Sequence, residues 1–123
     1  MKYLLIIFTL SLIFWGCTNR LNEDLLSIEE NGDLAFARRE YQAAVSLWSS
    51  AYAKNEKNAS LANKIGDAYF KLGKLDRAES FFKKAEQCDL ENIKTKINLA
   101  QVYVLLWKLP EAEKICEFLS EKN

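Results

Sequence analysis

Hydrophobic and polar residues recur with helical spacing along most of the chain, in paired segments separated by short polar breaks. The clearest pair predicts helices over 59–72 and 75–88. Gly73 stands in the break between them and is a natural helix stop. The polar turns NEKN and DLEN bound the pair on either side. Residues 59–92 are therefore predicted to form one helical hairpin.

The same pattern returns when the sequence is shifted by about 34 residues in either direction. The repeated segments are 25–58, 59–92 and 93–123. Helices in the outer two segments are predicted from 22–24 to 38, over 41–54, over 93–106 and over 110–121. The predicted fold is therefore all-α, with about six antiparallel helices stacked as three hairpins.

Small residues recur where the two helices of each hairpin are predicted to cross. One such site holds Gly32, Gly66 and Ala100, and another holds Ala44, Ala78 and Ala112. Large residues are predicted to fill the space between the helices, among them Trp48 and Phe82, whereas the third segment has Cys116 at the equivalent position. The core of the third segment is therefore predicted to be thinner. This periodic pattern of small and aromatic residues resembles the tetratricopeptide repeat, which implies an α-solenoid of three repeats.

The resemblance implies a module that binds a protein or peptide along the face lined by the first helix of each repeat. Equivalent positions on these helices are Glu29, Asn63 and Ile97, then Asp33, Asp67 and Gln101, then Phe36, Phe70 and Val104. An apolar stripe flanked by acidic and amide groups suits an extended or helical peptide. The alternative is that Phe36 and Phe70 turn inward and belong to the core.

Some tetratricopeptide domains hold a C-terminal carboxylate in a clamp of Lys and Asn side chains. Glu29 and Asp33 stand where that clamp requires its first Lys and Asn. Lys94 matches one later basic position, and Asn98 does not match the other. The sequence therefore disfavours a carboxylate clamp.

Residues 1–16 have the pattern of a signal peptide. Lys2 precedes an apolar run over 3–15 that is shorter than the roughly 20 residues of a membrane-spanning helix. The run ends in Gly16 and Cys17, which resembles a bacterial lipobox. The resemblance implies cleavage before Cys17 and lipidation of its sulfur, so that acyl chains anchor the protein in a membrane. An uncleaved apolar anchor or an ordinary secretory leader, in which Cys17 has no special role, is the alternative.

Residues 17–24 are predicted to form a tether between the lipid and the repeats, with the first helix starting at the cap-type and acidic residues 22–24. Thr18, rather than Asp, follows Cys17. We therefore expect a cell-envelope protein on the outer membrane, facing the periplasm. Secretion or an inner-membrane anchor is the alternative.

Composition limits the chemistry available to the chain. Lys and Arg total 17 and Asp and Glu total 17, so nucleic acid is not an implied partner. The chain has no His, no nucleophile–base pair and no metal-ligand spacing, so we expect neither an enzyme nor a cofactor. Cys88 and Cys116 are predicted to lie at different heights on successive helices, which disfavours a disulfide.

A second candidate contact lies at the end of the repeats. Apolar residues without a following repeat to cover them are Trp107, Ile115, Phe118 and Leu119. They predict an interface with a partner subunit or a homodimer through the C-terminal helix, unless they fold back locally. Together the features predict a membrane-anchored adaptor that binds a protein or peptide. The alternatives are a regulatory or substrate-presenting subunit of an enzyme or of a secretion or assembly machine, and a homodimerising structural lipoprotein.

Overall fold

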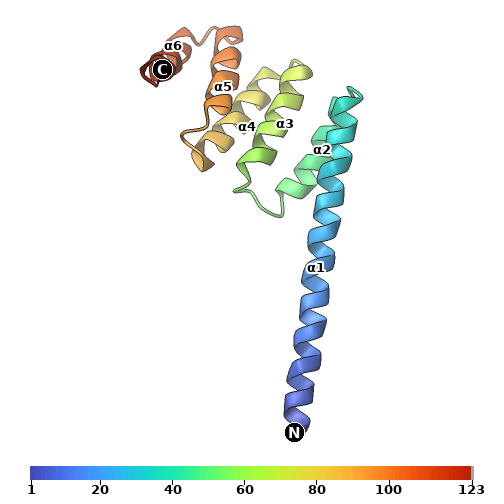
Figure 1. Cartoon of the computed structure of the whole chain (residues 1–123). Helices are drawn as coiled ribbons and strands as arrows, with labels where there is room; N and C mark the ends of the chain where they lie inside the picture. Colours follow the sequence, from blue (N-terminus) through green and yellow to red (C-terminus); the bar gives the residue numbers. More distant parts are fainter. Residues whose placement is uncertain (123) are drawn as a thin grey trace.

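Helices paired into hairpins make up the fold, as the sequence predicts. The computed structural model describes the backbone of residues 1–122 and their side chains, except the side chains of residues 14–19, 21 and 22. Within these residues the helices are α1 Lys2–Ala37, α2 Tyr41–Tyr52, α3 Ala59–Lys71, α4 Leu75–Cys88, α5 Ile93–Leu105 and α6 Leu109–Glu121. The hairpins α1–α2, α3–α4 and α5–α6 stack into a solenoid (Figure 1). From α2 onward the predicted bounds agree within one or two residues.

The first helix is longer than predicted. α1 is continuous from Lys2 to Ala37, so the predicted start at 22–24 is wrong for the uncut chain, and residues 17–24 are helical in it. The reason is local: the preceding residues include no Pro to stop a helix, and the single Gly16 costs only about 1 kcal/mol. Backbone N–H groups at 22–24 therefore find carbonyl partners one turn earlier and need no cap.

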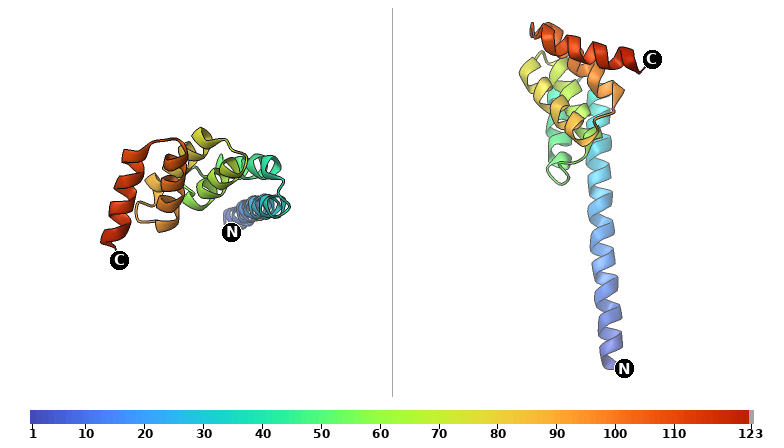
Figure 2. Two further views of the ribbon diagram at one scale, coloured as in Figure 1. Left: turned by 90° about the horizontal axis from the view of Figure 1, so that it is seen from above. Right: turned by 90° about the vertical axis from the view of Figure 1, so that its left-hand side faces the viewer.

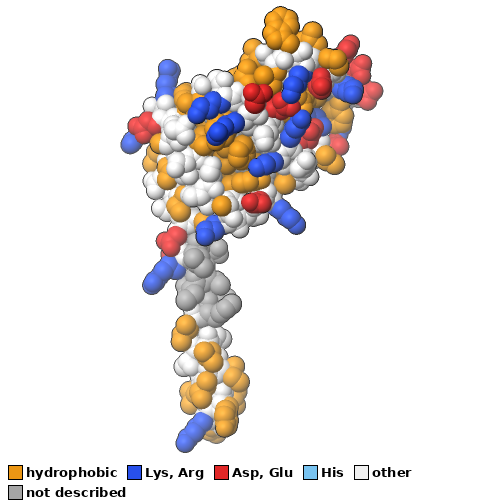
Figure 3. Space-filling model, turned by 180° about the vertical axis from the view of Figure 1, so that it is seen from behind, with side chains coloured by type: hydrophobic (Ala, Val, Ile, Leu, Met, Phe, Trp, Pro, Cys, Tyr) orange, Lys and Arg blue, Asp and Glu red, His pale blue; other side chains and the backbone are white. Residues whose placement is uncertain are grey.

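The N-terminal part of α1 projects away from the stack as an isolated helix (Figure 2). Its apolar side chains are exposed, among them Tyr3, Leu4, Leu5, Ile7 and Phe8. Hydrophobic side chains accordingly cover the free end of this helix (Figure 3). Within the described residues, no helix combines the length and apolar character needed to cross a membrane. The free end of α1 thus leaves a large apolar surface without a partner inside the chain.

The three hairpins share one turn geometry. Gly73 has a φ of 73°, and the equivalent residues Arg39 and Trp107 adopt 64° and 59°. After Gly73, the N–H of Lys74 bonds to the carbonyl of Tyr69 at 2.9 Å, and the same six-residue bond closes the other two hairpins. This Schellman motif requires a left-handed residue, which favours Gly. Arg39 and Trp107 therefore hold a strained conformation for the sake of the turn.

The core confirms the predicted crossing sites. A Cβ added to Gly32 would lie 2.4 Å from Nε1 of Trp48. A Cβ added to Gly66 would lie 2.6 Å from Cε1 of Phe82. Only Gly lets the aromatic ring of the second helix approach the first helix this closely, because real Cβ contacts are never so short. The ring and the glycine together form the centre of each of the first two hairpins.

The third hairpin packs less tightly than the others. α2 buries five side chains, whereas α6 buries only Ala112 among the residues described. Leu99 and Val102 of α5 are fully buried, but they face the preceding hairpin as well as α6. The predicted thinning of the last repeat is therefore present, and it falls between α5 and α6.

Candidate peptide-binding groove

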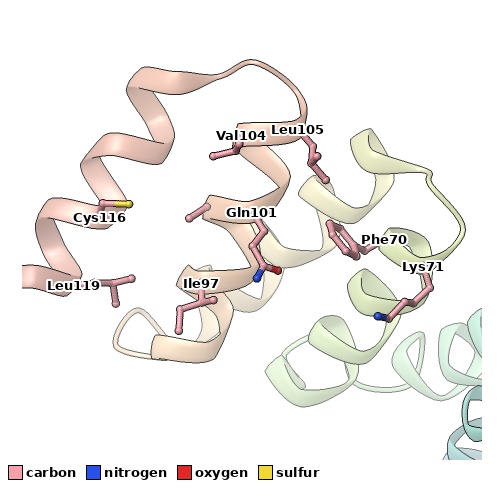
Figure 4. A pocket seen from close by; sticks show the side chains of 9 residues that line it. Phe70, Lys71, Ile97, Gln101, Val104, Leu105, Cys116 and Leu119 are labelled. Carbon is pink, nitrogen blue, oxygen red and sulfur yellow. The ribbon is translucent and has the colours of Figure 1, made fainter.

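An open groove of about 740 Å³ lies where α3, α5 and α6 meet. Its lining is almost wholly apolar, and it comprises Phe70, Lys71, Ile97, Ala100, Gln101, Val104, Leu105, Cys116 and Leu119. In Figure 4, Cys116 and Leu119 point from α6 towards Ile97 and Val104 on α5, and Phe70 lies on the opposite side of α5. The volume falls in the range of about 300–1,000 Å³ that is usual for ligand sites.

The groove joins two sets of residues that sequence reasoning kept apart. From the predicted peptide face it takes Phe70, Ile97, Gln101 and Val104. From the predicted C-terminal interface it takes Leu119. The structure thus places the end of the last repeat and the first-helix face around one surface.

Four lining residues were not among the candidates: Lys71, Ala100, Leu105 and Cys116. The signal that could have found two of them is the comparison between repeats. Ala100 and Cys116 occupy the sites of Gly66 and Phe82, so the third repeat lacks the central ring. A small residue in place of that ring leaves space, and this space opens into the groove.

Phe36 is half-buried and contributes mainly to packing. Its ring lies 5.2 Å from that of Tyr41 and 5.5 Å from that of Trp48, measured between centroids. Phe70 is also half-buried against the core, yet it reaches the groove. Phe36 therefore packs mainly against the core, whereas Phe70 belongs both to the core and to the binding face.

Asp33 and Asp67 line a smaller depression of about 230 Å³ with Phe36, Trp48 and Lys64. Lys64 occupies the acidic side of this depression, where its ammonium lies 2.7 Å from Glu29 and 2.8 Å from Asp33. Burial opposes the charged form, but the hydrogen bonds that Lys64 donates to Asp33 and Glu29 outweigh it and raise the pKa of Lys64. Glu29 and Asp33 of the first repeat thus share one cation within the chain.

Asn63 belongs to a third depression, together with Asp67 and Lys94. Its amide donates to the hydroxyl of Thr95 at 2.7 Å, which ties α3 to α5. The depressions along the predicted peptide face are joined: Asp67 lies in both smaller ones, and a further depression connects Asp67 with Phe70 and Gln101 of the groove. The groove at α3, α5 and α6 is the largest of these depressions.

The remaining residues of the predicted C-terminal interface do not line the groove. Trp107 is 83 % exposed at the turn between α5 and α6. Ile115 is half-buried against the core. Phe118 is half-buried near the other end of α6, with the ammonium groups of Lys96 and Lys122 at 4.5 and 5.2 Å from its ring centroid. Lys96 and Lys122 thus cover part of the apolar surface that was predicted to be exposed.

A buried carboxylate links α4 to the last hairpin. Glu79 is 7 % exposed and accepts from Lys108 at 2.6 Å and from Lys83 at 2.7 Å. Burial disfavours its ionised form, but the hydrogen bonds from Lys108 and Lys83 outweigh that effect and lower the pKa of Glu79. Because Lys108 stands just before α6, this ion pair fixes the position of the helix that closes the groove.

The described part of the chain contains no metal site and no disulfide. No group of three His, Cys, Asp or Glu side chains is placed there to hold a metal ion. Cys88 and Cys116 are free and exposed. The predicted lipidation site Cys17 lies outside the described side chains.

Comparison with known proteins defines the class of this chain. The tetratricopeptide repeat profile matches residues 26–91. The chain therefore belongs to the tetratricopeptide repeat family, whose fold serves protein–protein interaction.

Particular relatives extend the likeness. Tetratricopeptide repeat protein 21A of Mus musculus is 27 % identical over 114 residues, which are 90 % of this chain and 9 % of that protein. The chain thus spans a small part of this relative. The first tetratricopeptide domain of Spaghetti (RPAP3), bound to the HSP90 peptide SRMEEVD, is 27 % identical, with a TM-score of 0.72 over 76 % of this chain and 74 % of that one. The second domain of human RPAP3, in complex with the HSP70 peptide SGPTIEEVD, is 26 % identical, with a TM-score of 0.71 over 76 % and 78 %.

Proposed function

We propose that this protein is a membrane-anchored adaptor whose repeat domain binds a peptide segment of a partner protein in the groove at α3, α5 and α6. The observation that carries the proposal is the groove itself, an open apolar surface on a fold that serves protein interaction. Apolar side chains of a partner would remove this surface from water, at about 25 cal/mol for each Å² buried.

The shape of the site suits a peptide better than a small molecule. The groove is open along the length of α5, from Ile97 to Leu105, and its polar groups are Gln101 and Lys71. An extended chain can place apolar side chains between helix rows and pair its backbone with such groups. The Spaghetti and RPAP3 domains are peptide-bound relatives of the same fold, which supports this choice.

The chemistry of the bound peptide differs from that of the chaperone tails in those relatives. Those peptides are acidic and end in a carboxylate. In this chain the first repeat presents Glu29 and Asp33, and Lys64 is already bound by both. Lys64 is therefore not free to receive an acidic tail at that end of the face.

The exposed apolar end of α1 supports attachment to a membrane. Side chains over 2–13 are exposed, so a lipid bilayer is a natural environment for this segment before cleavage. After cleavage the acyl chains on Cys17 would take over the anchoring. The proposed address is the cell envelope, on the outer membrane facing the periplasm, where the adaptor would form part of a larger assembly.

Binding in the groove is tested by capture and then by direct measurement. The full chain is used to capture partners from an envelope extract, and the captured protein is purified and titrated. Val104→Lys places a charge in the groove and should weaken binding by about tenfold or more. Leu90→Lys is the matched control, because Leu90 is an equally exposed aliphatic residue that does not line the groove. Equal affinity for both variants would refute the proposed site.

Anchoring is tested separately. Expression with labelled palmitate should give a labelled product whose processing is blocked by globomycin, and Cys17→Ser should abolish the label. An unlabelled native protein would refute lipidation and leave the groove unaffected.

A further inference from the structure

The first two repeats show what the groove lacks. In each of them a ring from the second helix lies against a glycine of the first: Trp48 on Gly32, and Phe82 on Gly66. Both rings are buried, at 2 % and 1 % exposure. Each of these two hairpins therefore contains a socket, the space beside the glycine, that its own second helix fills with an aromatic side chain.

In the third repeat the socket is present but unfilled. Ala100 stands in place of the glycine and Cys116 in place of the ring, and both line the groove. The third repeat also lacks the aromatic ring that Phe36 and Phe70 provide on the first helix of the other repeats, because Val104 occupies the equivalent position. Cys116 is exposed, although its equivalents Trp48 and Phe82 are among the most buried side chains. The space that opens here matches, by repeat position, the space that an aromatic ring fills twice elsewhere in this chain.

The charge at the groove points to a second feature of the occupant. Lys71 is the only charged residue in the lining, and it is exposed. It forms no ion pair in the described part of the chain, although Asp67 lies one helical turn before it. An ammonium without an ion-pair partner beside apolar side chains favours an anionic partner.

We propose that the partner segment carries an aromatic side chain that enters the empty third socket, and an acidic side chain a few residues away that pairs with Lys71. This inference rests on the proposed function, because it names the chemistry of the peptide bound in the same groove. The aromatic residue lies beside Ala100 in the space that opens into the groove, further out than Phe82 lies on Gly66, because the Cβ of Ala100 prevents so close a contact. The acidic residue sets the direction in which the peptide lies along α5.

Selection from a random peptide library tests both features. The full chain is held in lipid nanodiscs, so that detergent does not fill the groove, and peptides displayed on phage are selected on it. Enriched sequences should share an aromatic residue with an acidic residue within about four positions, since extended residues advance about 3.3 Å each. Selection on Lys71→Glu should replace the acidic residue by a basic one and keep the aromatic residue.

Filling the socket provides the decisive variant. Ala100→Gly with Cys116→Phe rebuilds the arrangement of Gly66 and Phe82, and it should weaken the selected peptides by about tenfold or more. Leu90→Lys, which lies outside the groove, is the control, and it should retain binding within about twofold. Circular dichroism of every variant shows that its helices have formed.

Several outcomes would overturn the inference. Selected peptides without an aromatic residue, or peptides whose binding survives the filled socket, would show that no ring enters it. Self-association of the full chain that Trp107→Ala abolishes and that the selected peptides displace would place a second copy in the groove. Peptides that lack an aromatic residue yet compete with the captured partner would refute this inference alone. A partner that binds Val104→Lys with native affinity would refute the proposed function itself.

Discussion

The ring of Phe82 lies directly against Gly66, so α3 and α4 approach each other too closely here for residue 66 to carry a Cβ. A Cβ on residue 66 would stand 2.6 Å from Cε1 of the ring and 2.7 Å from Cδ1. The ring is 1 % exposed and has no room to withdraw. This contact leaves no space for a larger residue at the crossing point of the second repeat.

Gly66→Ala should therefore destabilise the fold by about 1–3 kcal/mol, as overpacked cores do, despite the better helix propensity of Ala. Thermal unfolding followed by circular dichroism gives the change. Adding Phe82→Leu to Gly66→Ala should make the two effects less than additive, because the second substitution removes the clash. A melting temperature that is unchanged in Gly66→Ala would contradict the close contact.

The empty third socket makes the opposite prediction. Ala100→Gly with Cys116→Phe should stabilise the free protein by about 1 kcal/mol, because burying a Phe ring contributes about 1.5–3 kcal/mol and the helical Gly costs about 1. Cys116→Phe alone should gain less, since the Cβ of Ala100 stands where the ring must lie. Urea unfolding of the full chain gives the difference, and a double variant less stable than either single one would show that the socket cannot close on a ring.

The left-handed turns offer a test of local strain. Arg39→Gly and Trp107→Gly should each stabilise the fold by about 0.5–1 kcal/mol, because L-residues resist a positive φ. Gly73→Ala should destabilise it by about 1 kcal/mol, and for this reason alone, since no atom lies within 4 Å of the added Cβ. Melting temperatures measured on the three variants should move in these two directions. Stabilisation by Gly73→Ala would be inconsistent with the turn described.

The Glu79 carboxylate predicts a dependence on pH. Its folded pKa lies below its ordinary value of 4.5, so its contribution is present above that pH and is lost as the pH falls through the folded pKa. Glu79→Gln should destabilise the fold at pH 7 by about 1–2 kcal/mol, the cost of a buried hydrogen-bonded charge that loses its ionic partners. As the pH falls through the folded pKa of Glu79, the difference between the variant and the native protein should shrink, because Glu79 then becomes neutral as well. A difference that does not change with pH would assign the effect to packing.

The ion pairs of Lys64 predict a lack of affinity for chaperone tails. The peptide SRMEEVD should bind the full chain no more tightly than a scrambled peptide of the same composition, because Glu29 and Asp33 occupy the cation that could receive a carboxylate. Fluorescence anisotropy with the labelled peptide measures this. Sequence-dependent binding of SRMEEVD would show that a carboxylate clamp exists despite the acidic first repeat.

Helix positions could be read from the sequence because each depends on local signals. Asn58 and Asn92 end their polar turns as N-caps, accepting from the N–H groups of Leu61 and Thr95 at 3.0 Å. Gly73 closes its hairpin for an equally local reason. The continuous α1 differs from the prediction because residues 22–24 would suit a helix start, while the residues before them contain no Pro that forces the helix to begin there.

The site was less predictable, since it depends on distances between helices. The first-helix positions Ile97 and Val104 follow from the repeat period, and they do line the groove. How far Cys116 stands from Ala100 depends on how α6 settles when the central ring is missing, which no periodic pattern describes. The pairing of Lys64 with Glu29 and Asp33 depends in the same way on the register between α1 and α3.

The unbroken course of α1 has a consequence for orientation. A helix turns by about 100° and rises by 1.5 Å for every residue, so its length sets the rotation of one end relative to the other. The apolar end and the first repeat lie on the same continuous helix α1, so the number of residues between them fixes the direction in which the groove faces relative to the apolar end. Inserting one residue near position 20 would swing the groove by about 100° around the helix axis, whereas inserting seven would return it to nearly the same heading, about 10 Å further out.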